Sequence, residues 1–302
     1  MKVRFYTLLY IEKSETRLLA AKMYSNNERI DLFVKNASIL DKSLKNFKLE
    51  GVTVLTNSIS ELESSKERIG YSNLNIKEID FSLQPPKEIP FYSAHFKIDV
   101  YNYFSTLPNY EYSILLDNDI VMLNKLPETF YEVVKQGIPM AYHIKDYIGT
   151  EGLKDIRRID PSIIAYQWCG GEFIAGCSQF YKELYTDILS FADKYFKEIN
   201  NGLFHIGDEM LTTISIEHLR SKGLYYYDAN SLGIIYRYWG NDEPHPLSHY
   251  PITFLHLPYD KVWCSKIKVE KFNTSEYFYS KYKPHRYLNI IKRYIKKMLG
   301  RI

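Results

Sequence analysis

The strongest chemical signal in the sequence lies at two aspartates, Asp117 and Asp119, which stand two residues apart after the apolar run at residues 114–116. Such a run is typical of a buried strand, and open α/β sheets bind their ligands at the carboxyl ends of their strands. Two carboxylates at this spacing can share a hard divalent cation that also holds phosphate oxygens. The sequence therefore predicts a metal-assisted phosphate site, with an ordinary polar loop after a strand as the alternative.

The Asp-Asn-Asp triplet resembles motifs of two enzyme families. One is the DxD element of nucleotide-sugar glycosyltransferases with the GT-A fold. The other is the nucleophile loop of haloacid dehalogenase-type phosphatases, in which the first aspartate is phosphorylated and the second acts as acid and base. That loop normally follows the first strand of its domain, whereas we predict three strands before Asp117, at residues 3–10, 30–34 and 51–55. The phosphatases also carry an acid where this chain has Thr212, so the glycosyltransferase interpretation is favoured.

Further candidate residues come from segments that are expected to reach the same edge of the sheet. Lys97 lies near the start of a predicted helix, residues 93–104, which precedes the acidic strand and therefore runs antiparallel to it. Its ammonium group could contact a diphosphate, and a solvated lysine is the alternative. Gly170 and Gly171 open a predicted strand, where glycines permit close approach of the backbone to a ligand; a turn before a core strand is the alternative.

Two acids and a histidine complete the set of candidates. Asp208 and Glu209 begin a predicted helix, where negative charge is favourable; capping alone explains Asp208 but explains Glu209 less well. His256 ends a predicted strand, and Lys261 and Trp263 follow shortly after it. An imidazole beside two carboxylates is a ligand set that suits manganese.

The order and spacing of these motifs over residues 1–265 resemble glycosyltransferase family 8, whose closing motif is a His, then a Gly, then Lys-Pro-Trp. The resemblance implies that Asp117, Asp119 and His256 hold Mn²⁺ (or Mg²⁺), and that Asp208 or Glu209, the candidate catalytic acids, faces the donor sugar. It also implies that the donor is a nucleotide-diphosphate sugar, with uridine as the expected base. The residues expected to contact this donor are Lys97, Asp117, Asn118, Gly170, Gly171, Glu172 and Lys261.

The activity implied by the resemblance is transfer of one hexose to a carbohydrate or glycolipid acceptor, with retention at the anomeric carbon. Bacterial surface polysaccharide or lipooligosaccharide synthesis is the expected setting. Glu172 would hold hydroxyl groups of the sugar, and Lys261 would contact the diphosphate. Glycosyltransferase family 6 also carries Asp-Glu at the corresponding helix start. A catalytically inactive GT-A domain that binds carbohydrate is the alternative from a different functional class.

Composition sets the broad class of the protein. The chain has 302 residues, of which 45% are hydrophobic and 25% charged, as is ordinary for a globular protein. A net charge of +3 is too small to predict nucleic-acid binding. The three cysteines lack metal-type spacing and the first residues do not resemble a signal peptide, so we expect a cytoplasmic protein. We predict a mainly parallel α/β sheet of GT-A type flanked by helices, with a catalytic domain over residues 1–270 and a tail over residues 271–302.

The end of the chain, residues 284–302, has the composition of a basic amphipathic helix. Read as a helix from Arg286, it places five apolar side chains on one face: Leu288, Ile291, Ile295, Met298 and Ile302. Its six cations are Arg286, Lys292, Arg293, Lys296, Lys297 and Arg301. Such a helix lies in the interface of an anionic membrane, so we predict peripheral contact with the inner face of the cell membrane. A terminal helix docked on the catalytic domain is the alternative.

Overall fold

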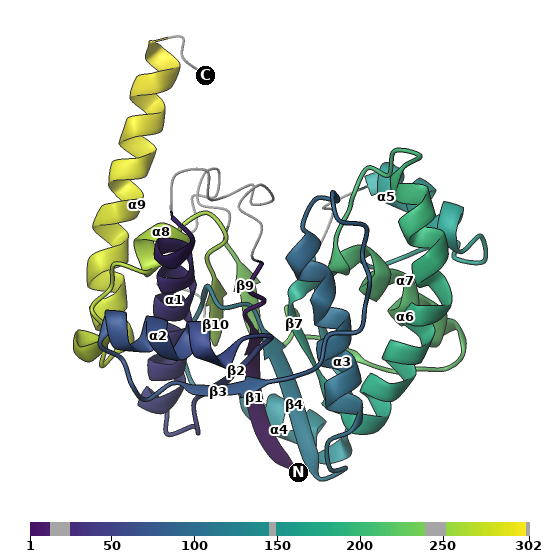
Figure 1. Ribbon diagram of the computed structural model, residues 1–302, viewed down its shortest axis with the longest axis horizontal. Coiled ribbons are helices and arrows are strands. Elements are labelled where there is room, and N and C mark those ends of the chain that lie inside the picture. The colour runs from purple at the N-terminus through teal and green to yellow at the C-terminus, as the bar shows by residue number, and fades with distance from the viewer. Residues whose placement is uncertain (13–24, 145–148, 239–251, 300–302) are drawn as a thin grey trace.

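A seven-stranded sheet with the order β3-β2-β1-β4-β7-β6-β8 forms the centre of the computed structural model (Figure 1), which describes residues 1–12, 25–144, 149–238 and 252–299. Its strands are β1 (Lys2–Leu8), β2 (Val52–Thr56), β3 (Asn75–Glu78), β4 (Glu111–Leu116), β6 (Met140–His143), β7 (Cys169–Cys177) and β8 (Tyr227–Asp228). Only β7 is antiparallel to its neighbours, β4 and β6. The predicted α/β fold with a mainly parallel sheet is confirmed.

Helices cover both faces of this sheet, as Figure 1 shows with α1 and α2 on one side and α3, α6 and α7 on the other. One buried cluster joins the sheet to α1 (Asn26–Asn46), α2 (Ile59–Ile69) and α4 (Glu128–Gln136). The opposite cluster joins it to the 3-10 helix η2 (Tyr92–Phe96), α3 (Lys97–Ser105), α5 (Gly149–Ile159), α6 (Ser178–Ile199) and α7 (Asp208–Ser221). The sheet is therefore buried on both faces, as its apolar strands require.

A second, three-stranded sheet lies beside the first. It consists of β5 (Ile120–Met122), β10 (Phe254–His256) and β9 (Ile235–Arg237), in that order. Its strands share a third buried cluster with α8 (Lys261–Cys264) and the beginning of α9 (Ser275–Met298), and the short 3-10 helix η3 (Val269–Lys271) lies between those two helices in sequence. Since β4 belongs to the large sheet and β5 to the small one, the acidic triplet at residues 117–119 is the link between the two sheets.

The strand predicted at residues 30–34 is wrong, because these residues lie inside helix α1. Ser25 and Glu28 form a reciprocal capping box, in which the backbone N–H of each donates to the side chain of the other, so the helix begins at Asn26. Ile30 and Val34 are buried four residues apart, which is helical spacing. Residues 40–47 read from the sequence as a separate helix, but they belong to the second half of α1. Residues 15–24 also read as a helix, and they lie outside the described residues.

Two stretches, residues 56–92 and 145–167, read from their polar and charged composition as irregular, but both contain regular elements. Residues 56–92 include helix α2, which ends at Gly70 in a left-handed conformation (φ 71°), and the edge strand β3. Residues 145–167 include helix α5, which buries Ile156 and Ile159. Both helices are short and rich in charge, so each offers few buried positions from which a helical period could be recognised. The tail helix also begins earlier than predicted, at Ser275, and passes through Pro284.

None of the helices that the structure describes combines the length and apolar character needed to cross a bilayer.

Candidate active site

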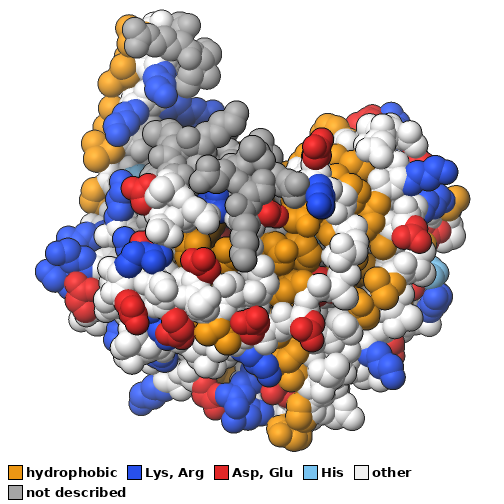
Figure 2. Space-filling view, viewed as in Figure 1, with side chains coloured by type: hydrophobic (Ala, Val, Ile, Leu, Met, Phe, Trp, Pro, Cys, Tyr) orange, Lys and Arg blue, Asp and Glu red, His pale blue; other side chains and the backbone are white. Residues whose placement is uncertain are grey.

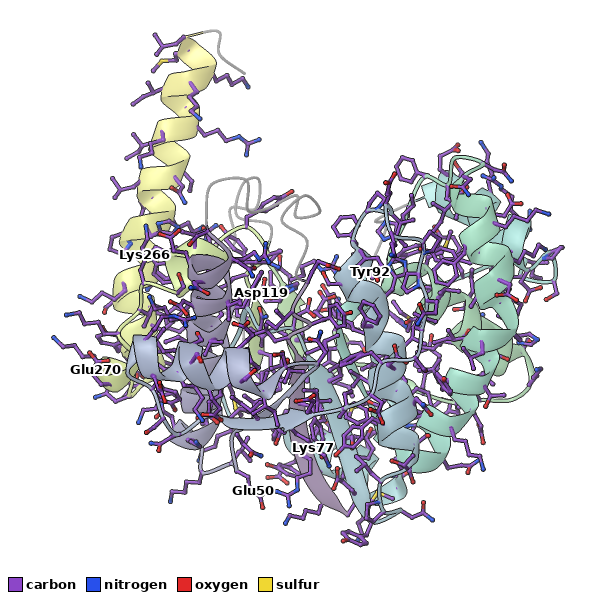
Figure 3. All side chains as sticks on the ribbon, viewed as in Figure 1. Glu50, Lys77, Tyr92, Asp119, Lys266 and Glu270 are labelled. Carbon is purple, nitrogen blue, oxygen red and sulfur yellow. The ribbon has the colours of Figure 1, made fainter. Side chains whose placement is uncertain are left out.

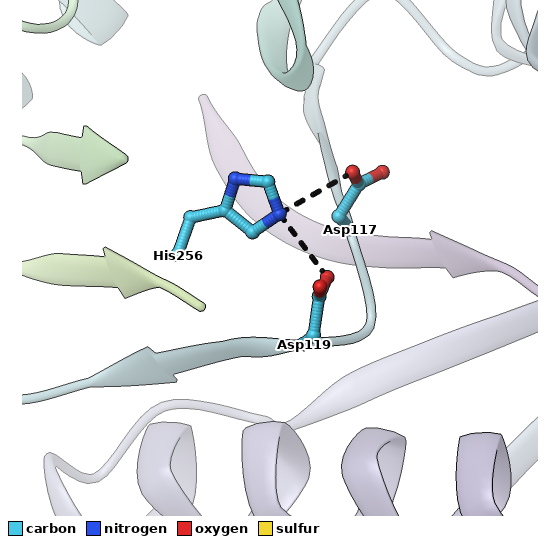
Figure 4. Close-up of side chains that lie close together, drawn as sticks. All are labelled: Asp117, Asp119 and His256. Atoms are coloured by element: carbon cyan, nitrogen blue, oxygen red, sulfur yellow. Dashed lines mark ion pairs between the residues drawn. The ribbon is translucent and has the colours of Figure 1, made fainter. Parts of the chain in front are cut away.

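Asp117, Asp119 and His256 converge between the two sheets, near the middle of the molecule, where Figure 3 places Asp119. Asp117 follows β4, Asp119 precedes β5, and His256 ends β10, which pairs with β5. Nε2 of His256 lies 3.2 Å from Oδ1 of Asp119 and 3.7 Å from Oδ2 of Asp117 (Figure 4). One ligand atom from each residue lies within 4.8 Å of the others. The fold thus brings together three residues that are far apart in sequence.

This cluster has the properties of a cation site. Asp119 is fully buried, and neither of its carboxylate oxygens has a hydrogen-bond partner among the described residues. Nε2 of His256 also lacks one, and His256 and Lys261 approach Asp119 only as ion pairs, both at 3.2 Å. Buried polar atoms without partners are costly, and a divalent cation would satisfy all three. Carboxylate and imidazole ligands together suit Mn²⁺.

The charges around the cluster support the same interpretation. The acids are Asp117, Asp119, Glu172, Asp208 and Glu209, and the permanent cations are Lys97, Arg237 and Lys261. The acids exceed these cations by two charges, which equals the charge of one divalent ion. Burial disfavours the charged imidazole, but the neighbouring Asp119 and Glu172 outweigh it and raise the pKa of His256 to about 9. A divalent ion bound here would displace that proton.

Lys97, at the start of α3, contacts both acidic segments at once. Its Nζ lies 2.8 Å from Oδ1 of Asp117 and 3.2 Å from Oδ2 of Asp208, and it donates to the carbonyl of Gly171 at 2.8 Å. Burial disfavours the charged ammonium group, but Asp117 and Asp208 raise its pKa well above the ordinary value. The side chain is only 11% exposed, so the alternative of a solvated lysine is wrong. Its contact with a diphosphate stays a prediction.

Lys261 approaches the cluster from the opposite side. It begins α8, and its Nζ lies 3.2 Å from Oδ2 of Asp119 while the side chain is 36% exposed. The side chain is therefore able to contact the protein acid and a ligand in solution. Asn118 is half-buried in the turn between the two aspartates. Trp263 instead packs on the tail helix, with its ring 5.0 Å from that of His285 and nearly parallel to it.

Gly170 and Gly171 make room for charged side chains of the protein itself. A Cβ added to Gly170 would lie 2.2 Å from Oε2 of Glu172. A Cβ added to Gly171 would lie 2.4 Å from Oδ2 of Asp208 and 2.9 Å from Nζ of Lys97. These distances are far shorter than van der Waals contact, so any other residue would push the acids and Lys97 apart. The glycine pair thus leaves room for the observed arrangement of these charged groups, independently of any ligand.

Glu172 lies in an irregular part of strand β7. Ala141 of β6 is opposite Ile174, but the next residue, Tyr142, is opposite Gly170, so the strand bulges around Glu172. The carboxylate is fully buried, forms a two-pronged ion pair with Arg237, and has Nδ1 of His256 3.2 Å from Oε1. Burial raises the pKa of Glu172, but Arg237 and His256 outweigh it and lower the pKa to about 2. Contact of Glu172 with sugar hydroxyls stays a prediction.

Glu209, in the first turn of α7, is held by several donors. Its Oε1 lies 2.5 Å from Nη2 of Arg237 and accepts from the backbone N–H of Gly171 at 3.1 Å. Its Oε2 accepts from the indole N–H of Trp168 at 2.8 Å. Burial raises the pKa of Glu209, but Arg237 more than compensates, so the pKa is lowered. Both carboxylate oxygens are therefore committed to the protein.

Asp208, the neighbouring acid, is much less committed. It is 5% exposed, its Oδ2 has no hydrogen-bond partner among the described residues, and Lys97 contacts it as an ion pair. Burial raises the pKa of Asp208 to about 6, with Lys97 opposing the rise and Glu209 and Asp117 adding to it. Asp208 is therefore the acid of this pair that is available to a bound ligand.

Sequence reasoning misses Arg237, which contacts Glu172 and Glu209 together. The segment at residues 233–238 reads as an aromatic strand with one charged residue, Arg237. An arginine in a buried strand is expected to have an acidic partner, and this is the signal that could have identified it. In the structure Arg237 is 6% exposed and is paired with both acids.

No known protein family matches the sequence, and no curated protein matches it. Solved glycosyltransferase structures nevertheless share its fold. The galactosyltransferase LgtC in complex with donor and acceptor sugar analogs aligns over 89% of this chain and 93% of its own, with a TM-score of 0.51 and 10% identity. An active-site mutant of LgtC gives the same coverage and TM-score with 11% identity. Mouse xyloside xylosyltransferase 1, in its apo form, aligns over 86% of this chain and 99% of its own, with a TM-score of 0.50 and 10% identity.

Proposed function

With the GT-A glycosyltransferase fold predicted from the DxD resemblance thus confirmed, we propose that the protein is a metal-dependent glycosyltransferase. It would move a hexose from a nucleotide-diphosphate sugar, with uridine as the expected base, to a carbohydrate acceptor. The observation that supports this most directly is the convergence of Asp117, Asp119 and His256 at the junction of the two sheets. A phosphatase of haloacid dehalogenase type is disfavoured, because the fold is that of glycosyltransferases.

The residues present fit the proposed chemistry. Asp117, Asp119 and His256 would hold Mn²⁺, which when bound acts as a Lewis acid toward the departing nucleotide diphosphate. Lys261, at the exposed side of the cluster, would add positive charge to the leaving group. Asp208 would place negative charge beside the sugar, where an oxocarbenium-like state develops. We expect retention at the anomeric carbon.

A panel of nucleotide sugars tests this proposal. We expect the purified protein with Mn²⁺ to release nucleotide from one of them, and a carbohydrate acceptor to increase the rate. Hydrolysis of phosphomonoesters without use of any nucleotide sugar would favour the phosphatase instead. Binding of carbohydrate without Mn²⁺ binding or nucleotide release would favour an inactive carbohydrate-binding domain.

We further propose that the end of α9 contacts an anionic membrane, where a glycolipid acceptor would be found. The first part of the helix packs on the body through Phe278 and Tyr282, and Nε2 of His285 lies 2.8 Å from Oδ1 of Asp260. Beyond its first part the helix projects from the body (Figure 1), and Figure 2 shows hydrophobic side chains along its outer edge. Leu288, Ile291, Ile295 and Met298, which belong to the predicted apolar face, are all exposed, and so are Tyr287, Ile290, Tyr294 and Leu299. We propose that the membrane-contacting part of the tail begins near residue 286, within the tail predicted over residues 271–302.

Deletion of residues 287–302 is expected to release the protein from anionic vesicles while turnover on a soluble acceptor is unchanged. Each Lys or Arg near an anionic surface contributes about 1 kcal/mol, so the loss of the cations between residues 292 and 297 corresponds to more than about a hundredfold in vesicle affinity. Cosedimentation at low salt measures the effect, and the double variant Ile291→Ser, Ile295→Ser tests the apolar face separately. Full-length protein that fails to cosediment with anionic vesicles would contradict the proposal.

A further inference from the structure

Arg237 joins the two halves of the candidate active site. Its guanidinium contacts both oxygens of Glu172, with Nε 2.5 Å from Oε1, and its Nη2 lies 2.5 Å from Oε1 of Glu209. The arginine and Glu172 are buried, and Glu209 is 14% exposed. One guanidinium group therefore forms ion pairs with two acids that belong to different elements, β7 and α7.

The position of Arg237 in the small sheet makes this link consequential. Strands β9 and β10 are parallel neighbours, and Arg237 is directly in register with His256. Both side chains reach the same carboxylate of the large sheet, because Oε1 of Glu172 lies 2.5 Å from Nε of Arg237 and 3.2 Å from Nδ1 of His256. Glu172 of the large sheet thus contacts two residues of the small sheet, and one of them is the candidate metal ligand His256.

We propose that Arg237 is a positioning residue that holds His256, through Glu172, and the first turn of α7, through Glu209, in fixed relation to each other. This inference rests on the proposed metal-dependent transfer. The reacting sugar must lie between the cation and the acids of α7, so their separation has to be held constant. A hydrogen-bonded network that joins the candidate metal ligands to the acids of α7 would hold the two at a constant distance before the donor binds.

The chemistry of arginine suits this task better than that of lysine. A planar guanidinium can bind one carboxylate with two parallel hydrogen bonds and still donate to a second carboxylate, whereas an ammonium group is a compact point charge. The site also has room for it, because a Cβ on Gly170 would lie 2.9 Å from Nη2 of Arg237 and would displace the guanidinium from its present position. When a metal-binding histidine loses a carboxylate partner on its second ring nitrogen, metal affinity or activity typically falls by 10–100-fold.

The test is the Arg237→Lys variant, which keeps the buried positive charge but cannot reproduce the fork. We expect Mn²⁺ affinity, measured without donor by the electron paramagnetic resonance signal of free Mn²⁺, to fall about tenfold, and kcat to fall by a similar factor. The matched control is Arg158→Lys, since Nε and Nη2 of Arg158 both donate to Oε2 of Glu198 between α5 and α6, and its partners among the described residues lie outside the site. That variant should retain wild-type Mn²⁺ affinity and kcat.

Wild-type Mn²⁺ affinity and kcat in Arg237→Lys would overturn the proposal. A buried positive charge would then be sufficient at this position, and the geometry of the guanidinium would have no role. If that variant does not fold, Glu172→Gln provides the decision: it keeps the side-chain volume, and we expect about tenfold weaker Mn²⁺ binding. Unchanged Mn²⁺ binding in a folded Glu172→Gln variant would also overturn the proposal. Wild-type protein that binds no Mn²⁺ would instead overturn the proposed function, and the Arg237 inference with it.

Discussion

Replacement of Asp119 with Asn is expected to reduce Mn²⁺-dependent nucleotide release by about a thousandfold or more. A catalytic cation contributes several kcal/mol to transition-state stabilisation, and each 1.36 kcal/mol corresponds to about a factor of ten in rate. Asp119 is the most deeply buried of the three candidate ligands, and none of its oxygens has a hydrogen-bond partner among the described residues. Asn has nearly the same volume, so the variant removes the charge without opening a cavity. Steady-state nucleotide release and Mn²⁺ titration measure the two consequences.

Asp41→Asn is the matched control for loss of a buried carboxylate. Asp41 is 1% exposed and accepts hydrogen bonds from Lys45, the backbone N–H of Val52 and Tyr71, away from the candidate site. Its replacement should cost about 1–3 kcal/mol of unfolding free energy and leave Mn²⁺ affinity unchanged. If chelator-treated wild-type protein released nucleotide at its full rate without added metal, the metal assignment would be wrong.

The sequence was sufficient to predict the positions of candidate site residues that lie at the ends of predicted strands. Asp117 and Asp119 follow a continuous apolar run and His256 ends a predicted strand, so their places at strand ends followed from the pattern. The grouping of His256 with the two acids came from the resemblance to family 8. Lys97 was placed by topology, because a helix that precedes a strand returns antiparallel to it. In each case one local rule determined the position of the residue.

The elements and residues that were missed depend on tertiary contacts. Residues 30–34 contain β-branched and aromatic side chains that favour a strand, but the capping box at Ser25 and the buried surface of α1 outweigh that preference. Arg237 and Glu172 are more than sixty positions apart in the chain, and their pairing arises only when the small sheet meets the large one. No spacing rule within a single segment reports such a contact.

Replacement of Asp208 with Asn is expected to reduce kcat by about 100- to 1000-fold while the donor KM changes little. Asp208 and Asp117 both contact Nζ of Lys97, so Asp208 lies on the side of the site where the donor sugar would meet the diphosphate. A negative charge there is of most use when positive charge develops at the anomeric carbon, and removal of one such electrostatic contact typically costs this factor in kcat. Asn keeps one oxygen for Lys97, so the ground-state arrangement is conserved. Steady-state kinetics over donor concentration separate kcat from KM.

A comparison with Glu209→Gln shows which of the two acids, Asp208 or Glu209, acts at the reacting carbon. Glu209 already contacts Arg237, Trp168 and the backbone of Gly171, so we expect its replacement to lower thermal stability and to reduce kcat less than Asp208→Asn does. The reason is that three donors already occupy most of the roughly four acceptor sites of this carboxylate, which leaves it less capacity for the sugar than Asp208 has. A wild-type kcat in Asp208→Asn together with a large loss in a stably folded Glu209→Gln variant would reverse the assignment and make Glu209 the acid that acts at the reacting carbon.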